Sequence, residues 1–400
     1  AGNGPAMIAL AGLLLRGEGI EADVQQARKL LLQAISDGNV EYGSVALGDL
    51  YAAQTPLRDL RKAAAAYEAA ANAGSTWAMI KLANMRAQGY GGPANPAAAV
   101  RLLQQAIDAG NVADAAMALA SVYLGKNAFS PVKAVAAYQL AADAGSVDAA
   151  IALAQMLIAG KPVPADPDRA LAVLEKAVTV DGGAVSGEAL GDFYLEKTPL
   201  RDVAKAEAAY QSAADKNNVE AMLKLATLLA KPEIGPPQRD RAAALLRSAM
   251  ALGEAARAGL ALGDLYLADG DVTAASAAYE AAAAAGNPSA HLALALLASQ
   301  ATDEADRIEK SLAHFIAVAK LGEANTAAVA MMKLPGDVLV AAVQTLLTDR
   351  GYSTVIDGKY GAGTRNSILS FCSAKAIKGC DGAFVTVNLL QALLTAPAKS

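Results

Sequence analysis

Few residues of this chain have the type and spacing that chemistry requires. The sequence of 400 residues contains two histidines, His291 and His314, on predicted helices and without nearby cysteines or spaced carboxylates. This pattern predicts no zinc site. No Gly-x-Ser-x-Gly elbow, phosphate-binding glycine loop or Cys–His pair within one element occurs. We therefore expect no enzyme activity, no metal and no cofactor. A catalytic carboxylate pair stays an open alternative, because 39 acidic residues offer many combinations.

The two cysteines, Cys372 and Cys380, lie eight residues apart, and the chain has no other thiol. Such a pair favours a disulfide and an oxidising compartment. The alternative is two buried free thiols in a cytosolic protein.

Charge and hydropathy exclude two classes of partner. Residues from Asp337 onward contribute +2 and the preceding residues −7 to the net charge of −5. Neither part is strongly basic, so we expect no nucleic-acid partner. No apolar run reaches the roughly 18 residues of a membrane-spanning helix. The opening Ala1-Gly2-Asn3-Gly4 is similar to later repeat ends such as Ala73-Gly74-Ser75. We therefore expect an array that starts mid-repeat, and an export signal or anchor could precede it.

Most of the chain, including both histidines, is made of a repeating unit. A glycine or asparagine turn recurs about every 36 residues, at Gly38, Gly74, Gly110, Gly145, Gly182, Asn217, Gly253, Gly286 and Gly322. A fixed period of this size is typical of stacked supersecondary units, each of which buries its apolar face against its neighbours.

The sequence of the repeat from Glu41 to Gly74 predicts two helices, at 42–53 and 57–72. Gln54-Thr55-Pro56 separates them, because proline lacks a donor and restricts the preceding residue. Asp59 is expected in the first turn of the second helix, and Gly74 ends it. The fold class is thus all-α: about nine αα-hairpins in a right-handed solenoid over 1–334, followed by a small three-helix domain over 335–400.

A finer pattern has a period of two repeats. Thr55-Pro56-Leu57-Arg58-Asp59 recurs unchanged at 198–202, and longer inter-helix loops are expected in every second unit, on one edge, at 17–23, 89–96, 160–167 and 231–240. Two sets of tyrosines follow the same period, and we interpret them as packing residues: Tyr51, Tyr123, Tyr194 and Tyr266, and Tyr67, Tyr138, Tyr210 and Tyr279.

The units resemble Sel1-like repeats, which are relatives of the tetratricopeptide repeat. The resemblance rests on Leu47-Gly48-Asp49-Leu50-Tyr51 and its copies at 190–194 and 262–266, together with the second tyrosine set and the turns. It implies a scaffold for protein partners in which the first helix of each unit lines a concave face. Asp49, Asp192 and Asp264 are then candidate contacts that form an acidic stripe; the alternative is simple solvation. The repeats contain no cysteine, unlike the secreted cysteine-rich branch of this family.

The tail predicts helices at 338–349, 363–376 and 386–395. Between the first two lies a D-G-x-Y-G-x-x-T run, which resembles the peptidoglycan-binding-like fold of bacterial envelope proteins. The resemblance implies a wall-binding or ligand-binding loop made of Asp357, Gly358, Tyr360, Gly361, Thr364 and Arg365. Cys372 and Ser373 depart from the family pattern. The alternative is a tail that caps the array or docks on a protein.

The order of parts resembles the periplasmic region of polar organelle development proteins of alphaproteobacteria. It implies a periplasmic scaffold in cell polarity, with protein partners and contact with peptidoglycan or another envelope polysaccharide, as part of a larger membrane-anchored protein. The alternatives are a component or regulator of exopolysaccharide synthesis or export, and a dedicated wall-binding module.

Overall fold

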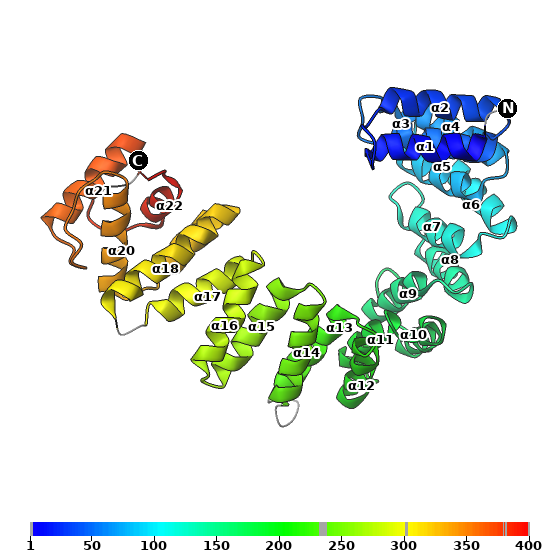
Figure 1. Ribbon diagram of the computed structural model, residues 1–400. Helices are drawn as coiled ribbons and strands as arrows, with labels where there is room; N and C mark the ends of the chain where they lie inside the picture. The colour runs from blue at the N-terminus through cyan, green and yellow to red at the C-terminus, as the bar shows by residue number, and fades with distance from the viewer. Residues whose placement is uncertain (1–2, 232–237, 301–302, 379, 381, 399–400) are drawn as a thin grey trace. The chain divides into compact units, whose positions relative to one another are not determined.

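The computed structural model describes residues 3–231, 238–300, 303–378, 380 and 382–398, and gives no side-chain burial for 304–306. Its regular elements are helices, and the described residues contain no strand (Figure 1). The predicted all-α repeat fold is therefore confirmed. The chain divides into two compact units, residues 1–213 (unit 1) and 214–400 (unit 2).

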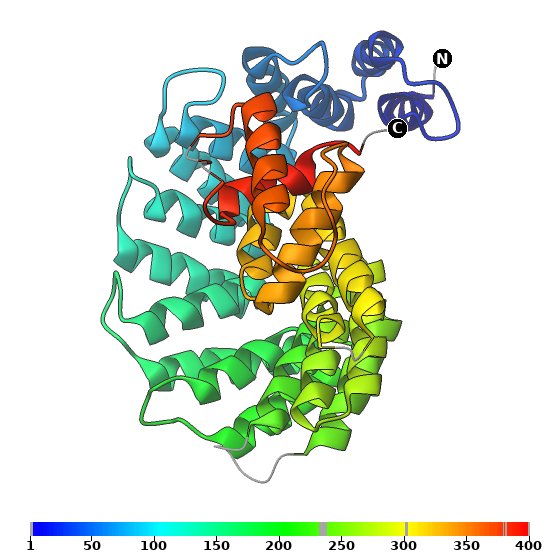
Figure 2. The ribbon, with the colours of Figure 1, turned by 90° about the vertical axis from the view of Figure 1, so that its left-hand side faces the viewer.

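Unit 1 consists of helical hairpins. Its helices are α1 (Gly4–Arg16), α2 (Val24–Ser36), α3 (Val40–Ala52), α4 (Leu60–Asn72), α5 (Thr76–Gln88), α6 (Pro96–Asp108), α7 (Val112–Leu124), α8 (Pro131–Asp143), α9 (Val147–Ala159), α10 (Pro167–Asp181), α11 (Ser186–Leu195) and α12 (Val203–Ala214). Helices α1 and α2, α3 and α4, and so on to α9 and α10 pack as pairs, and each pair packs on the next. Figure 2 shows the cyan and green hairpins of this unit as successive layers, with their inter-helix loops on one side.

Unit 2 continues the hairpins and adds the tail. Its helices are α13 (Val219–Ala230), α14 (Arg239–Ala251), α15 (Ala255–Ala268), α16 (Val272–Ala284), α17 (Pro288–Ala298), α18 (Glu304–Val318), α19 (Ala324–Met331), α20 (Gly336–Asp349), α21 (Ala362–Lys375) and α22 (Val387–Thr395). None of the helices among the described residues is long and apolar enough to cross a membrane.

All nine predicted turn residues have left-handed backbone conformations, with φ between 62° at Asn217 and 104° at Gly253. Glycine adopts this conformation without a steric penalty, and asparagine is among the few other residues that tolerate it. The left-handed residue lets the chain leave one helix and enter the next hairpin within two or three residues. The predicted period is thus confirmed at every turn.

Fully buried alanines determine how closely the hairpins stack. One position of the second helix is alanine with no exposed surface in successive repeats: Ala27, Ala63, Ala99, Ala134, Ala170, Ala206, Ala242 and Ala275. A methyl group at this point allows close approach of the neighbouring backbone, and a larger side chain would overpack it. The high alanine content of the sequence is therefore the composition of a thin, two-layered core.

The predicted start of the second helix is wrong by one turn. Helix α4 begins at Leu60, and Asp59 is its N-cap, which accepts hydrogen bonds from the backbone of Arg61 and Lys62 at 3.0 and 3.1 Å. Residues before Asp59 form a loop, because Thr55 accepts from the N–H groups of Leu57 and Arg58 instead of continuing a helix. An aspartate N-cap satisfies otherwise unpaired helix donors.

The predicted alternation of loop length is also wrong in unit 1. The loops at 17–23, 53–59, 89–95 and 160–166 have the same length. The turn that the Thr-Pro sequence forms replaces a helical extension, so the units with this sequence have loops as long as the others. The predicted loop at 231–240 lies mainly outside the described residues.

The three tail helices are where the sequence predicts them, within one or two residues. They do not have a core of their own. Val338, Leu346, Phe371 and Leu390 belong to one buried cluster that also contains side chains of α18 and α19, and α22 packs directly on α19. The domain boundary predicted after Leu334 therefore stays a prediction, and the residues on both sides of it share their hydrophobic burial.

Candidate binding surface

Three of the second-set tyrosines form the same hydrogen bond. The hydroxyls of Tyr67, Tyr210 and Tyr279 donate to the carboxylates of Asp49, Asp192 and Asp264 at 2.7, 2.6 and 2.7 Å. Burial, together with this carboxylate, raises the pKa of each tyrosine well above its ordinary value. Each aspartate of the predicted acidic stripe thus has a structural partner in the second helix of its own hairpin.

The glycine before each of these aspartates makes room for the ring. A Cβ atom placed on Gly48, Gly191 or Gly263 would lie 2.5, 2.5 or 2.3 Å from the nearest atom of the tyrosine. Such distances are far below van der Waals contact. The Leu-Gly-Asp sequence therefore works as a unit: glycine receives the ring face and aspartate receives the hydroxyl. The interpretation of this tyrosine set as packing residues is confirmed, since Tyr67, Tyr138, Tyr210 and Tyr279 are all buried.

The remaining tyrosine of this set, Tyr138, lies in the hairpin of α7 and α8, which has no aspartate at the equivalent position. Ala120 and Ser121 take the places of glycine and aspartate, and the Ser121 hydroxyl donates to the Met117 carbonyl at 3.2 Å. Ala120 has no exposed surface, and Tyr138 is still 8% exposed. The tyrosine of this hairpin is therefore buried without the glycine and without the hydrogen bond to aspartate.

The first helices of neighbouring hairpins also contact each other directly in unit 1, as α1 with α3, α5 with α7, and α9 with α11. We call these first helices the inner layer. The Lys81 ammonium of α5 lies 2.8 Å from the Asp49 carboxylate of α3 and 5.8 Å from the centre of the Tyr67 ring. The ion pair is exposed, so its contribution to stability is small.

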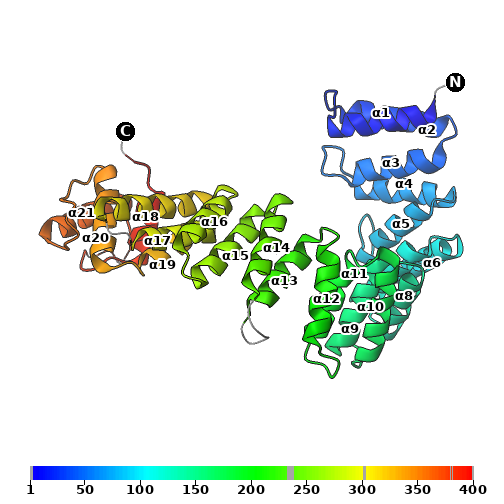
Figure 3. The ribbon, with the colours of Figure 1, turned by 60° about the horizontal axis from the view of Figure 1, so that its bottom comes forward.

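An open groove of unit 1 lies on this inner layer, between α9 and α11. Its volume is about 780 Å³. Ile151, Gln155 and Ile158 line it from α9, and Asp192 and Glu196 line it from the other side. Figure 3 shows helices α9 to α12 that surround this region. A smaller groove of about 330 Å³ lies beside Tyr67 and is lined by Arg58 and by Lys81, the partner of Asp49. Hence two grooves adjoin Tyr–Asp pairs.

Asp192 is the one residue of this groove that the sequence predicts as a candidate contact. The signal was present: Ile151 and Ile158 are large apolar residues, seven apart on a first helix that is otherwise rich in alanine. Both side chains are only half-buried. What the sequence could not show is that α9 and α11 leave an open groove between them.

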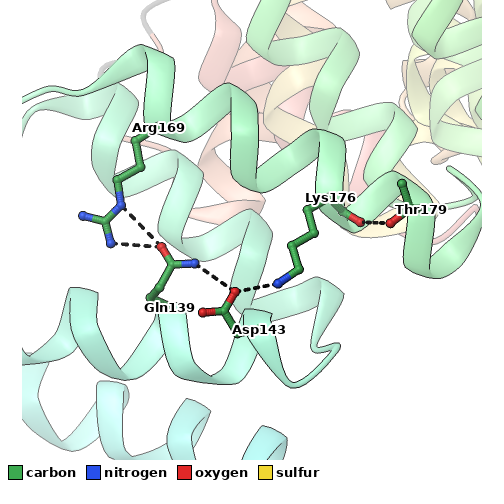
Figure 4. Close-up of polar contacts among 5 residues, drawn as sticks. All are labelled: Gln139, Asp143, Arg169, Lys176 and Thr179. Atoms are coloured by element: carbon green, nitrogen blue, oxygen red, sulfur yellow. Dashed lines mark hydrogen bonds and ion pairs between the residues drawn. The ribbon is translucent and has the colours of Figure 1, made fainter.

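Polar contacts join two neighbouring second helices on the other layer (Figure 4). Gln139 accepts two hydrogen bonds from the Arg169 guanidinium, at 3.3 and 2.9 Å. The Lys176 ammonium lies 2.6 Å from the Asp143 carboxylate and holds the pKa of that carboxyl below its ordinary value. Thr179 donates to the Lys176 carbonyl. The polar side chains between these two second helices therefore pair with one another, whereas the inner layer has an open groove between α9 and α11.

In the tail, one buried glutamine organises the predicted wall-binding loop. The Gln344 side chain is fully buried. Its amide donates to the Asp357 carboxylate, the Lys359 carbonyl and the Thr364 hydroxyl at 2.9, 3.1 and 2.9 Å, and its oxygen accepts from the Asp357 and Gly358 N–H groups, both at 3.0 Å. The motif residues Asp357 and Thr364 therefore have a structural role in this loop. The Gln344 hydrogen bond lowers the pKa of Asp357.

The remaining motif residues lie nearer the surface. Gly361 and Arg365 are exposed at the start of α21, and the Tyr360 hydroxyl donates to the Gly382 carbonyl at 2.7 Å. Exposed apolar side chains occur on the same loops, with Val355 at 73% and Phe384 at 78%. The predicted disulfide is present, joining Cys372 of α21 to Cys380. Ligand binding by these residues stays a prediction.

The two histidines meet across α17 and α18. Their Nδ1 atoms are 3.1 Å apart. Burial lowers the pKa of both imidazoles, and the neighbouring His291 lowers that of His314 further. Among the described residues no group of three or more histidine, cysteine or acidic side chains could hold a metal ion.

The model of the Sel1 repeat matches residues 4–39, 78–111, 147–179 and 219–254. These four segments are similar to the Sel1 repeat. In the structure these segments are the hairpins that begin with α1, α5, α9 and α13. The matched segments are therefore every second hairpin from α1 to α14. The hairpins between them carry the Leu-Gly-Asp sequence, except α7–α8, which has Leu119-Ala120-Ser121 in its place.

The solved structures that are similar to this chain include the following two. The protective antigen c5321 of uropathogenic Escherichia coli strains, which has an SLR fold, is 21% identical, with a TM-score of 0.47 over 98% of this chain and 91% of that one. A Sel1 repeat protein from Oxalobacter formigenes is 22% identical, with a TM-score of 0.42 over 54% of this chain and 88% of that one. No curated protein matches the sequence.

Proposed function

We propose that this protein is a scaffold that binds protein partners through its inner layer. The observation that carries the proposal is the open groove between α9 and α11, where half-buried isoleucines lie beside exposed carboxylates. Apolar surface that adjoins charged groups is typical of sites that exclude water when a partner binds. Repeat arrays present such surfaces as their usual function.

The Tyr–Asp pairs support this role because they hold the surface in place. Tyr210 and Asp192 join the two helices of one hairpin at the groove itself. A preorganised surface loses less conformational entropy when a partner binds than a mobile one does. The same hydrogen bond at Tyr67 and Tyr279 extends this rigidity to other hairpins.

Site-specific photo-cross-linking tests the proposal. A photoreactive phenylalanine replaces Asn84 or Gln155, which are exposed on first helices, or Gln25, which is exposed on the second helix α2. We expect defined cross-linked species in cells from Asn84 and Gln155 and none from Gln25. Equal cross-linking at all three positions, or none at any, would contradict binding through the inner layer.

A second function, contact with the cell wall, is favoured by the exposed tail loops. Phe384 is 78% exposed, and exposed aromatic rings provide flat apolar faces for partners. The disulfide between Cys372 and Cys380 supports a periplasmic location for both functions. The role in cell polarity that the order of parts implies belongs to this proposal as well.

Sedimentation with purified sacculi tests wall contact. Truncation after Leu334 is unsuitable, because it removes α22 from its contact with α19 and opens a shared core. Phe384→Ser in the full chain changes an exposed side chain, and Phe129→Ser is a matched control at 61% exposure in unit 1. Wall contact through the tail predicts that only Phe384→Ser lowers the bound fraction. Sedimentation that is unchanged by this substitution would count against it.

A further inference from the structure

The smaller groove of unit 1, beside Tyr67, combines an apolar lining with an exposed polar edge. Its lining residues come from the end of α3, the loop before α4, α4 itself, and α5 with the loop that follows it. The apolar lining residues are buried or half-buried, whereas the exposed ones are an arginine, an asparagine and a tyrosine. A volume of about 330 Å³ lies at the lower end of the range of ligand pockets. The groove therefore has room for a short part of a partner.

The two aspartates closest to this groove already have partners. Asp49 accepts the hydrogen bond of the Tyr67 hydroxyl and pairs with Lys81, so the charges of Asp49 and Lys81 offset each other. Asp59 caps α4, and its carboxylate lies 3.5 Å from the Lys62 ammonium. The backbone N–H of Lys62 is the main cause that holds the pKa of Asp59 below its ordinary value. Neither aspartate therefore neutralises a further cation at the groove.

Arg58 is such a cation. Its side chain is exposed and lines the groove, and among the described residues its guanidinium has no acidic partner and no hydrogen-bond acceptor. The equivalent arginine of the second Thr-Pro-Leu-Arg-Asp loop, Arg201, donates to the Leu195 carbonyl of its own hairpin at 3.4 Å. The same loop sequence thus leaves only the first arginine available to a partner. A guanidinium binds a carboxylate through two parallel hydrogen bonds.

An exposed aromatic ring lines the same groove. Tyr90 is 57% exposed and follows α5, where its N–H donates to the Met85 carbonyl at 2.9 Å. Tyrosine provides a large and rigid contact area at a low cost in conformational entropy. The buried Met85 also lines the groove, and methionine adapts its shape to the group that packs on it. These neighbours favour an aromatic or large aliphatic side chain next to the carboxylate.

We propose that the groove beside Tyr67 binds a segment of a partner protein in which an aspartate or glutamate lies next to an aromatic or large aliphatic residue. The carboxylate pairs with Arg58. The apolar side chain packs on Leu60 and Met85, beside the Tyr90 ring. This inference rests on the proposed function and specifies the class of partner at one groove.

Selection from a random peptide library displayed on phage, with the full chain immobilised, tests the inference. We expect selected peptides to carry aspartate or glutamate next to phenylalanine, tyrosine, tryptophan, leucine or methionine. Synthetic copies should bind more weakly at about 0.3 M than at about 0.05 M salt, because screening weakens exposed charge pairs.

Two matched pairs of variants at exposed residues identify the groove. Arg58→Glu reverses the charge at the groove, and Arg201→Glu makes the same change in the second copy of the loop. Tyr90→Ser removes the exposed ring of the groove, and Tyr42→Ser removes a ring that is 68% exposed elsewhere in unit 1. We expect each groove variant to weaken peptide binding by about tenfold or more and each control by less than about twofold.

The outcomes separate the inference from the proposed function. Peptides that bind the Arg58→Glu and Arg201→Glu variants equally well would overturn the groove assignment. Selected peptides that are basic, or apolar without an acidic residue, would overturn the class of partner, and a library without any binding peptide would overturn the inference as a whole. The proposed function is judged separately by cross-linking at Gln155, which lines the other groove. Cross-linking at that position would leave the scaffold proposal standing in each of these cases.

Discussion

Replacing Gly191 with alanine tests the packing of the Leu-Gly-Asp sequence most directly. In an ordinary helix interior this change stabilises by about 1 kcal/mol, because alanine restricts the unfolded backbone and favours the helix. At Gly191 the new Cβ atom would lie 2.5 Å from the Tyr210 ring, which is fully buried. Overpacking costs about 1–3 kcal/mol. We expect a net destabilisation of about 1 kcal/mol, the opposite sign from the ordinary case.

Urea unfolding of the full chain, followed by helical circular dichroism, measures this effect. Gly12→Ala in α1 is the matched control, because its Cβ atom would contact only the end of the Arg16 side chain, at 3.3 Å. We expect Gly12→Ala to raise the unfolding midpoint and Gly191→Ala to lower it. Equal stabilisation by both substitutions would show that Tyr210 moves aside freely, and would refute the role assigned to the glycine.

Three further predictions follow from single contacts. Tyr210→Phe and Asp192→Ala should each lower the free energy of unfolding in urea by about 1 kcal/mol, because both remove the hydrogen bond between these two side chains. The double variant should therefore lose less than the sum of the single losses, and additive losses would contradict the pairing. Gln344→Leu should destabilise unit 2 by about 3 kcal/mol and expose the amides of 357–364 to hydrogen exchange, because five hydrogen bonds are lost; unchanged exchange would contradict its organising role. Burial lowers the pKa of His291 and His314, so the unfolded chain takes up protons at a higher pH than the folded chain does. The melting temperature should therefore fall as the pH drops below about 6.5, and His314→Gln should reduce that fall. An equal fall in the variant would contradict the assignment to these histidines.

The turns were predictable from the sequence because their cause is local. A left-handed backbone conformation favours glycine or asparagine, so these residue types at a fixed period indicate where the turns lie. The start of α4 was missed although Asp59 is a strong N-cap signal, because the apolar pattern also fits a helix from Leu57. The tail helices were predicted from their apolar periodicity, although α21 ends at a left-handed alanine, Ala376.

The site depends on contacts between residues that are distant in sequence. Asp49, Asp192 and Asp264 were predicted as exposed acids, but their tyrosine partners come from the next helix of each hairpin. The Asp357 and Thr364 side chains were predicted to face a ligand, and they contact Gln344, which precedes both in a different helix. Periodicity indicates which residues share a face, but it does not indicate which polar groups meet across two faces.

The repeated Thr-Pro-Leu-Arg-Asp loop has a consequence for the length of the protein. At both copies the aspartate N–H donates to a tyrosine carbonyl, from Asp59 to Tyr51 and from Asp202 to Tyr194, and the threonine makes the same turn. The chain therefore has two interchangeable junctions with whole hairpins between them. Duplication or deletion of the segment between these junctions changes the number of hairpins without creating a loop of new sequence. The number of binding surfaces is in this sense a separate property from the fold.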